Sequence, residues 1–68
     1  MHFTIEAEQE EDRRWLAEVL EIPGVLSYGR SQEDAIAGTQ ALALRVLADW
    51  IEHAHNLPAP VAISFDIV

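Results

Sequence analysis

One long helical segment constrains the fold of this chain more than any other feature, because a helix must bury its apolar side on a neighbouring surface. The helix is expected to begin at Ser31, whose hydroxyl can cap free backbone amides, with Asp34 completing a capping-box pattern. It is expected to run to about His55, beyond which three residues disfavour its continuation: Asn56, Pro58 and Pro60. The rest of the chain must provide the surface on which this helix packs.

Alternating apolar and polar residues predict short strands outside the helix. These strands are Phe3 to Ala7, Trp15 to Val19, Val25 to Tyr28 and Val61 to Phe65. The polar run from Glu8 to Arg14 predicts an exposed hairpin loop between the first two strands, because its charges oppose packing. Pro23-Gly24 predicts a tight turn before the third strand, since glycine accepts the positive φ that such a turn requires.

The order of these elements predicts the fold class. Neighbouring strands joined by short loops pair antiparallel, and a crossover helix then brings the last strand parallel to the first, most simply beside it. The expected fold is therefore an α+β two-layer β-β-β-α-β sandwich with a mostly antiparallel sheet and one long helix on one face. Its 68 residues are about half the usual size of a domain, so residues 1–68 form a single domain.

A helical wheel centred on Ile36 predicts which side of the helix faces the sheet. At about 100° per residue, these residues lie within about 80° of Ile36: Gln40, Ala43, Leu44, Leu47, Trp50, Ile51 and Ala54. Leu42 and Val46 lie about 80° to 120° off this stripe, which indicates a second contact. They are expected either to pack on the helix edge under a loop or to form a self-association surface.

The charge of the chain limits its partners. Twelve acidic residues against four arginines, with no lysine, give a formal net charge of −8. Direct binding to nucleic acid is not expected, because its affinity comes from clustered cations and the counterions that they displace. A basic protein partner suits this electrostatic field better.

Composition also predicts the environment of the chain. There is no cysteine, which excludes disulfides and thiolate zinc sites and fits a reducing cytoplasm. No apolar run approaches the ~20 residues that a membrane span requires, so we expect a cytoplasmic protein that does not enter membranes. A domain this small buries only about 60% of its unfolded surface on folding, which favours a homo-oligomer or a bound partner.

The sharpest enzymatic hypothesis is a magnesium-dependent nuclease. Glu6 and Glu8 share the outward face of the first strand, and Asp66 projects outward from the strand expected beside it. Carboxylates gathered on a sheet can hold magnesium for phosphate-ester hydrolysis. The favoured interpretation is a solvated acidic face, because no cation lies near to grip a phosphate and the net charge repels such a substrate.

The other chemically capable side chains predict no catalytic, cofactor or metal site. His53 and His55 lie about 200° apart on the helix and cannot grip one metal ion, and His2 lies at a terminus. The serines carry no nucleophile-elbow glycine pattern; they are Ser27, Ser31 and Ser64. Trp15 and Trp50 are expected in the core rather than as cofactor stackers.

Three runs of residues, in this order along the chain, resemble the HicB-like antitoxin family. They are EDRRWLAEV from Glu11 to Val19, LEIPGV from Leu20 to Val25, and YGRSQEDA from Tyr28 to Ala35. The resemblance extends from Thr4 to about Phe65. Members of that family often carry glycine at the position of Arg13 and proline at the position of Leu20.

The resemblance implies a degenerate ribonuclease-H-like fold that kept the sheet and lost the catalytic carboxylates, and hence a protein that is not an enzyme. HicB-type proteins neutralise a small basic mRNA-cleaving toxin of the HicA kind by covering its active site. Longer members add a C-terminal DNA-binding domain that represses the operon. The sequence ends at Val68 without such a domain, so repression by that route is not expected.

The leading hypothesis is therefore an antitoxin-like module that binds a HicA-like ribonuclease. The residues predicted to contact this partner are Glu6, Glu8, Leu16, Glu18, Tyr28 and Arg30. One alternative is a solitary HicB-like protein that acts as a homo-oligomeric interaction module through Leu42 and Val46. The less favoured alternative is the magnesium nuclease.

Overall fold

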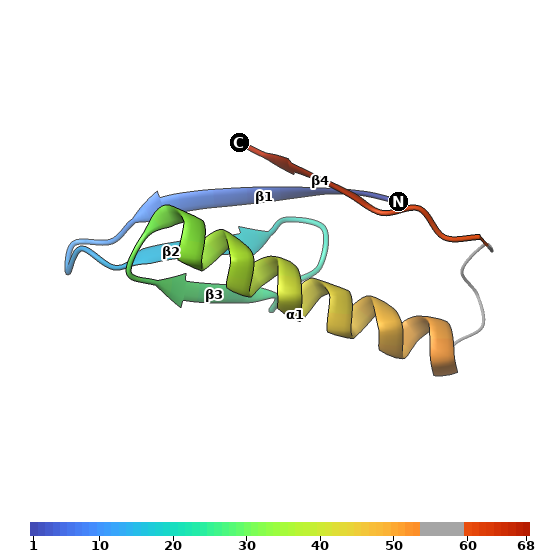
Figure 1. Cartoon of the computed structure of the whole chain (residues 1–68). Coiled ribbons are helices and arrows are strands. Elements are labelled where there is room, and N and C mark those ends of the chain that lie inside the picture. Colours follow the sequence, from blue (N-terminus) through green and yellow to red (C-terminus); the bar gives the residue numbers. More distant parts are fainter. Residues whose placement is uncertain (54–59) are drawn as a thin grey trace.

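Four strands form one mixed sheet, and one helix lies across one of its faces (Figure 1). A computed structural model describes residues 1–53 and 60–68. The elements are β1 (His2–Gln9), β2 (Trp15–Val19), β3 (Leu26–Gly29), α1 (Gln32–His53) and β4 (Ser64–Ile67). The strand order is β3-β2-β1-β4, with β1 antiparallel to β2, β2 antiparallel to β3, and β1 parallel to β4. The predicted α+β sandwich is confirmed.

The core lies between the sheet and α1. Alternate residues of β1 and β2 point toward the helix, as a period of two requires. Phe3 and Ile5 of β1 are buried with Ala17 and Val19 of β2. The other buried apolar side chains are Ile22, Val25, Ala35, Ala43 and Leu47.

The loop between β1 and β2 is shorter than the sequence predicts. The predicted loop began at Glu8, whereas the strands stay paired as far as Gln9 and Trp15. Backbone hydrogen bonds then close the loop: the N–H of Glu10 donates to the carbonyl of Arg14 at 2.7 Å, and the N–H of Arg13 donates to the carbonyl of Glu10 at 3.0 Å. Cross-strand hydrogen bonds therefore extend the β1–β2 pairing to Glu8 and Gln9. The charge pattern of the sequence had placed both residues in the loop.

Two positions take the left-handed backbone conformation. Gly24 has a φ of 88°, which confirms the predicted Pro23-Gly24 turn. Arg13 has a φ of 72° at the tip of the β1–β2 loop. A residue with a side chain is strained in the left-handed conformation, because its Cβ approaches the following carbonyl oxygen. Glycine is the residue that this conformation favours.

The structure confirms the start of α1. The backbone N–H of Asp34 donates to Ser31 Oγ at 3.1 Å, and the N–H of Ala35 donates to the Ser31 carbonyl at 3.1 Å. The helix is described as far as His53. The predicted end at about His55, with Asn56 and Pro58, lies outside the described residues.

The predicted packing side of α1 is confirmed only in part: Ala43 and Leu47 are buried and Ile36 packs against the core, but the packed side is rotated from the predicted one. The buried residues are Ala35, Thr39, Ala43 and Leu47, and Leu42 and Val46 pack half-buried against the same core. Three residues of the predicted stripe are exposed instead: Leu44 at 46%, Trp50 at 37% and Ile51 at 43%. The packed side is centred about 60° from Ile36, and Ala54 lies outside the described residues.

The position of Leu42 and Val46 removes the reason for predicting self-association through them. Both side chains pack against the core, so neither lies on the part of α1 that the sheet leaves uncovered. They therefore contribute to the packing of α1, which was the other interpretation of their position. Any second contact of the helix must use residues that the sheet leaves exposed.

Thr39 fixes the helix to the centre of the sheet. It is fully buried, and its Oγ1 donates a hydrogen bond to the carbonyl of Ala17 in β2 at 2.9 Å. One residue earlier, a Cβ on Gly38 would lie 2.5 Å from Ser27 Oγ of β3. The missing side chain of Gly38 therefore allows α1 to approach β3 closely.

Replacing Arg13 with glycine should stabilise the protein. The substitution relieves a left-handed conformation that costs about 1–2 kcal/mol, and the greater freedom of glycine in the unfolded chain offsets about half of that gain. We expect the free energy of unfolding, measured by urea denaturation, to rise by about 0.5 kcal/mol. Glu11→Gly in the same loop, where φ is negative, should lower it. Equal losses in both variants would contradict this account of the loop.

Candidate interaction surface

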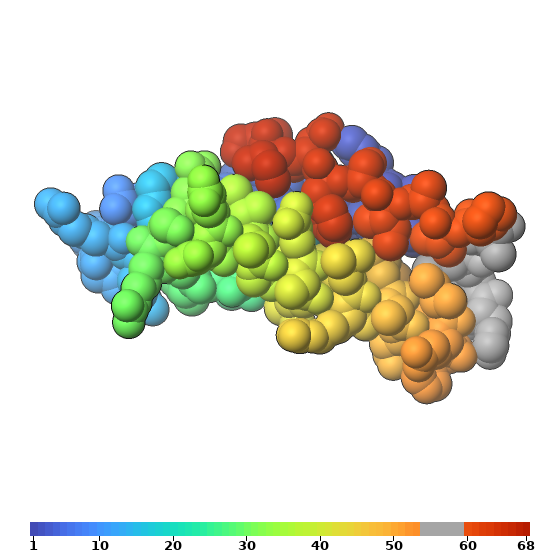
Figure 2. Space-filling view, in the orientation of Figure 1, coloured from blue at the N-terminus to red at the C-terminus, as the bar shows by residue number. Residues whose placement is uncertain are grey.

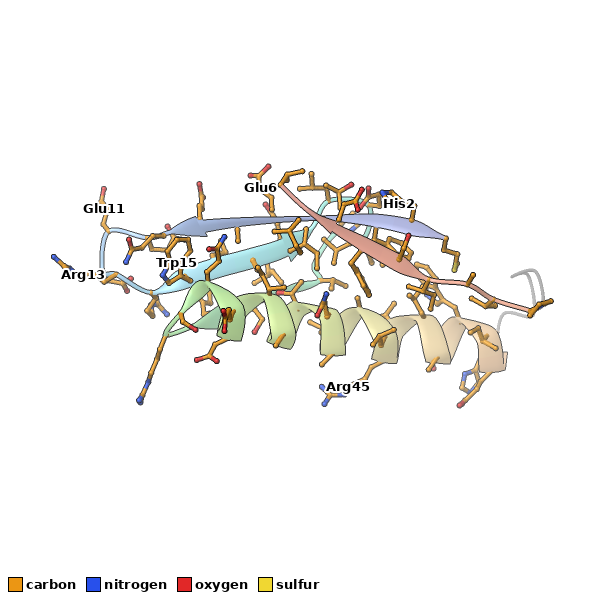
Figure 3. The ribbon with its side chains drawn as sticks, turned by 45° about the horizontal axis from the view of Figure 1, so that its top comes forward. His2, Glu6, Glu11, Arg13, Trp15 and Arg45 are labelled. Carbon is orange, nitrogen blue, oxygen red and sulfur yellow. The ribbon has the colours of Figure 1, made fainter. Side chains whose placement is uncertain are left out.

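The face of the sheet that α1 leaves uncovered carries most of the predicted contact residues. The strand registers align them in two rows, Glu6–Glu18–Leu26 and Glu8–Leu16–Tyr28, each crossing β1, β2 and β3. We call these six residues the open face. Figure 3 shows the side chain of Glu6 on the side of the sheet away from α1. Five of the six predicted contacts therefore lie together on one surface.

A pair of like charges lies at the centre of the open face. Glu6 of β1 is directly opposite Glu18 of β2. Directly opposed side chains on neighbouring antiparallel strands have Cβ atoms about 4.5–5.5 Å apart, and like charges at that spacing destabilise the sheet. Glu8 extends the negative potential along β1. A cation placed over this pair would relieve the repulsion.

Apolar side chains occupy the β2–β3 side of the open face. Leu26 is 40% exposed and Tyr28 is 48% exposed. Leu16 is half-buried and lies between Glu8 of β1 and Tyr28 of β3. The open face therefore combines carboxylates on β1 with apolar area on β3. A partner that presents a cation next to an apolar group would complement both parts.

Arg14 closes one end of the open face. Its guanidinium carbon lies 4.3 Å from the centre of the Tyr28 ring, and its Nε donates to Asp12 Oδ2 at 2.7 Å. The backbone N–H of Arg14 also donates to Asp12 Oδ1, and these two hydrogen bonds hold the pKa of the Asp12 carboxyl below its ordinary value. The arginine is therefore bound within the chain, at the rim of the surface.

Arg30, the sixth predicted contact, lies just beyond the end of β3. It is exposed, but no strand register aligns it with the two rows. Sequence reasoning missed Leu26 and Arg14. Leu26 could be recognised only from the β2–β3 register, whereas the Asp12-x-Arg14 spacing was visible in the sequence.

A chain of hydrogen bonds joins His2, Ser64 and Asp66. Ser64 Oγ lies 2.9 Å from His2 Nδ1, and His2 Nε2 lies 2.8 Å from Asp66 Oδ2. Parallel pairing of β1 with β4 brings these residues together, and the sequence analysis missed it because they are 62 or more positions apart.

The three side chains follow the order of a serine–histidine–aspartate relay. They lie, however, on an exposed surface of the protein. His2 and Asp66 side chains are 57% and 65% exposed, and the described residues form no cavity that could hold a substrate. Nucleophilic catalysis depends on placed oxyanion donors and on the exclusion of water. We therefore assign the three residues to the attachment of β4 to β1.

The predicted magnesium ligands do not form a metal site. Asp66 is in register with Thr4 rather than with Glu6, and it contacts His2. Residues 1–53 and 60–68 contain no group of three histidine, aspartate or glutamate side chains that could hold a metal ion. His53 contacts Asp49 through Nδ1 at 3.0 Å, and His55 lies outside the described residues. The nuclease hypothesis has no site within the described chain.

Glu21 attaches the β2–β3 turn to β1. Its Oε1 accepts a hydrogen bond from the Thr4 backbone N–H at 2.7 Å, and its Oε2 accepts one from Thr4 Oγ1 at 2.8 Å. Both bonds favour the charged carboxylate, and they lower the pKa of Glu21 from its ordinary value of 4.5. The turn is thereby held to the edge of the open face.

Comparisons of the chain with protein-family models, with curated proteins and with solved structures find no match. The helix in the described part is not long and apolar enough to cross a membrane. The resemblance to HicB-like antitoxins therefore depends on the residue runs from Glu11 to Ala35.

Neutralising one carboxylate of the central pair should stabilise the free protein. In Glu18→Gln, the repulsion across β1 and β2 disappears, so we expect the free energy of unfolding at neutral pH to rise by about 0.5 kcal/mol in low salt. The gain should shrink in 1 M salt, because ions screen the repulsion in the parent protein. Glu52→Gln on the exposed side of α1 is the matched control. A loss of stability in Glu18→Gln at low salt would show that the pair is not repulsive.

The Glu21 bonds predict a specific pH dependence. Because the folded-state pKa is lowered, Glu21 stabilises the protein fully above about pH 5, and this contribution is lost as the pH falls through 4.5 toward the folded pKa. Glu21→Gln should therefore lose less stability than the parent between pH 5 and about 3. The measurement is urea denaturation at several pH values, with Glu11→Gln as control. Identical pH profiles for the parent and Glu21→Gln would contradict the assignment.

Proposed function

We propose that this protein is an antitoxin-like binding module that neutralises a small basic mRNA-cleaving ribonuclease of the HicA type by covering its active site. The observation that carries the proposal is the open face. It places Glu6, Glu8 and Glu18 next to Leu16, Leu26 and Tyr28 on a surface that no described element covers.

Electrostatics supports a basic partner. A ribonuclease cleft must attract RNA phosphates, so it carries cations, and the three carboxylates of the open face offer them a negative surface. A cation of the partner that enters between Glu6 and Glu18 would replace a repulsion with two attractions. The net charge of −8 would also steer such a partner into contact over a distance.

The apolar part of the open face supports binding by a protein. Tyrosine is among the residues that contribute most at interfaces, since it buries a large ring and keeps a hydroxyl for hydrogen bonding. Tyr28 is flanked by Leu16 in the neighbouring strand, and Leu26 lies two residues earlier in β3. Burial of these side chains would supply affinity, while the carboxylates would supply selectivity for a basic surface.

The positions of the predicted magnesium ligands also agree with the proposal. Glu6 lies opposite Glu18 and Glu8 lies opposite Leu16, whereas Asp66 of β4 is in register with Thr4 and is engaged by His2 of β1. An acidic sheet whose Asp66 is already engaged by His2 fits a binding role better than magnesium-dependent hydrolysis. Together with the resemblance of Glu11 to Ala35 to HicB-like sequences, this arrangement favours the antitoxin-like function over the nuclease.

The test is co-expression with a small basic ribonuclease of the HicA type, and the product of the adjacent open reading frame is the first candidate if it is small and basic. The parent protein should restore growth and form a stable complex with that protein. Glu6→Lys/Glu18→Lys should abolish growth rescue and slow association by at least about tenfold at low salt. Glu11→Lys/Glu52→Lys changes the net charge equally away from the open face and should retain rescue.

Two results would overturn the proposed function. Rescue by Glu6→Lys/Glu18→Lys at the parent level would remove the open face from the interface. Cleavage of RNA by the purified protein alone, dependent on magnesium and lost in Asp66→Ala, would support the nuclease instead.

A further inference from the structure

The outer edge of β3 presents backbone groups with which no described strand pairs. β3 is an edge strand of the sheet, and Figures 1 and 2 show it at the lower margin of the sheet, where its atoms reach the surface beside α1. The N–H of Val19 donates to the carbonyl of Val25 at 2.9 Å, so the backbone of Val25 is directed toward β2. This direction alternates along a strand. The N–H and C=O groups of Leu26 and Tyr28 therefore point away from β2.

These four backbone groups are available to a partner. Within residues 1–53 and 60–68, the one hydrogen bond to any of them is a long one, 3.4 Å, from Ser27 Oγ to the Tyr28 carbonyl. Proteins commonly protect a free edge with a charged side chain or a proline. β3 has the sequence Leu-Ser-Tyr-Gly and carries neither, whereas the other edge strand, β4, carries Asp66. An extended polypeptide is the ligand whose hydrogen bonds match such an edge.

We propose that the free edge of β3 pairs with an extended, antiparallel strand of the basic partner. This strand carries an apolar residue opposite Tyr28 and, two residues later, an arginine or lysine opposite Leu26. The pairing would continue the sheet by one strand and place both partner residues beside the open face. The inference rests on the proposed function for the identity of the partner, but the edge itself can be tested separately.

The carboxylates of the open face select the cation. Directly opposed residues of antiparallel strands have their side chains on the same face, so the residue opposite Leu26 extends the row Glu6–Glu18–Leu26. Two strand spacings, about 10 Å, separate this position from Glu18. An extended arginine and an extended glutamate together bridge that distance, and the apolar stem of the arginine then covers Leu26. The charge of the partner strand would thus reach the repelling Glu6–Glu18 pair.

Arg14 selects the apolar residue and fixes the order of the two. The residue opposite Tyr28 extends the other row of the open face. The Arg14 guanidinium already lies 4.3 Å from the centre of the Tyr28 ring, so it repels a second cation there, whereas an apolar side chain can pack on the ring. Read from its N-terminus, the partner strand therefore has the order apolar, any residue, cation. The reverse order would place the cation beside Arg14.

Charge disfavours a second copy of this chain as the occupant of the edge. Pairing of two β3 strands would join both open faces into one continuous surface that carries Glu6, Glu8 and Glu18 of each copy. Each copy also has a net charge of −8. Such a dimer would add to the repulsion that a cationic strand relieves.

Titration of the labelled protein with two synthetic peptides, followed by NMR, tests the edge without any ribonuclease. Both are capped nonapeptides of equal composition and charge, polythreonine with Val-Thr-Arg or Arg-Thr-Val at the centre. The Val-Thr-Arg peptide should bind with a dissociation constant of about 0.1–1 mM, and the reversed peptide at least about fivefold more weakly. Near saturation, the amides of Leu26 and Tyr28 should exchange with solvent about tenfold more slowly, whereas the exchange of the Ser27 amide, which faces β2, should change little.

Two variants at one position separate the backbone from the side chain. Leu26→Pro removes the outward N–H without removing a hydrogen bond to β2, and proline is tolerated in edge strands. Leu26→Ala is its matched control, since it loses the apolar side chain but keeps the N–H. We expect Leu26→Pro to bind the Val-Thr-Arg peptide at least about fivefold more weakly than Leu26→Ala.

Three results would overturn the edge pairing: no amide shifts at about 5 mM peptide, equal affinity for the two peptides, or unchanged exchange of the Leu26 and Tyr28 amides in the bound parent protein. The last measurement does not depend on the folding of a variant. Peptide binding without growth rescue would refute the proposed function and support the edge. Growth rescue by a complex in which the Leu26 and Tyr28 amides stay unprotected would refute the edge and leave the proposed function in place.

Discussion

The structure depends on the fact that a single helix can cover only one face of a four-stranded sheet. Phe3, Ile5, Ala17 and Val19 all point toward α1, and the buried Thr39–Ala17 hydrogen bond fixes the helix over the centre of that face. The residues between them in the strands must then point toward solvent. The open face is thus a direct consequence of the topology, and its residues lie outside the core between the sheet and α1.

The position of these residues outside the core allows the unusual content of the open face. A sheet selected only for stability would carry opposite charges at the positions of Glu6 and Glu18. It would also have polar residues in place of Leu26 and Tyr28, or another element covering them. The chain does neither of these. Residues that weaken the free protein but complement a cationic, partly apolar surface are expected where selection acts on binding.

Local signals in the sequence predicted most of the fold. The alternation in β1 and β2, the Ser31 cap and the positive φ of Gly24 each depend on a few neighbouring residues, and all are confirmed. The packed side of α1 was predicted only in part, with Ala43 and Leu47 buried but Leu44, Trp50 and Ile51 exposed, because apolar residues also lie on the exposed side of the helix and a wheel centred on Ile36 includes both groups. The His2–Ser64–Asp66 contacts and the place of Leu26 depend on strand register, which no local pattern contains.

The central claim of the proposed function is that the open face, and not the helix, would bind a basic ribonuclease. Amide chemical-shift mapping of the labelled protein, titrated with a small basic ribonuclease of the HicA type, tests this claim most directly. We predict the largest shifts at Glu6, Glu18, Leu26 and Tyr28, with the amides of α1 from Ala41 to Ile51 almost unchanged. Shifts confined to α1, with β1, β2 and β3 unaffected, would contradict the account.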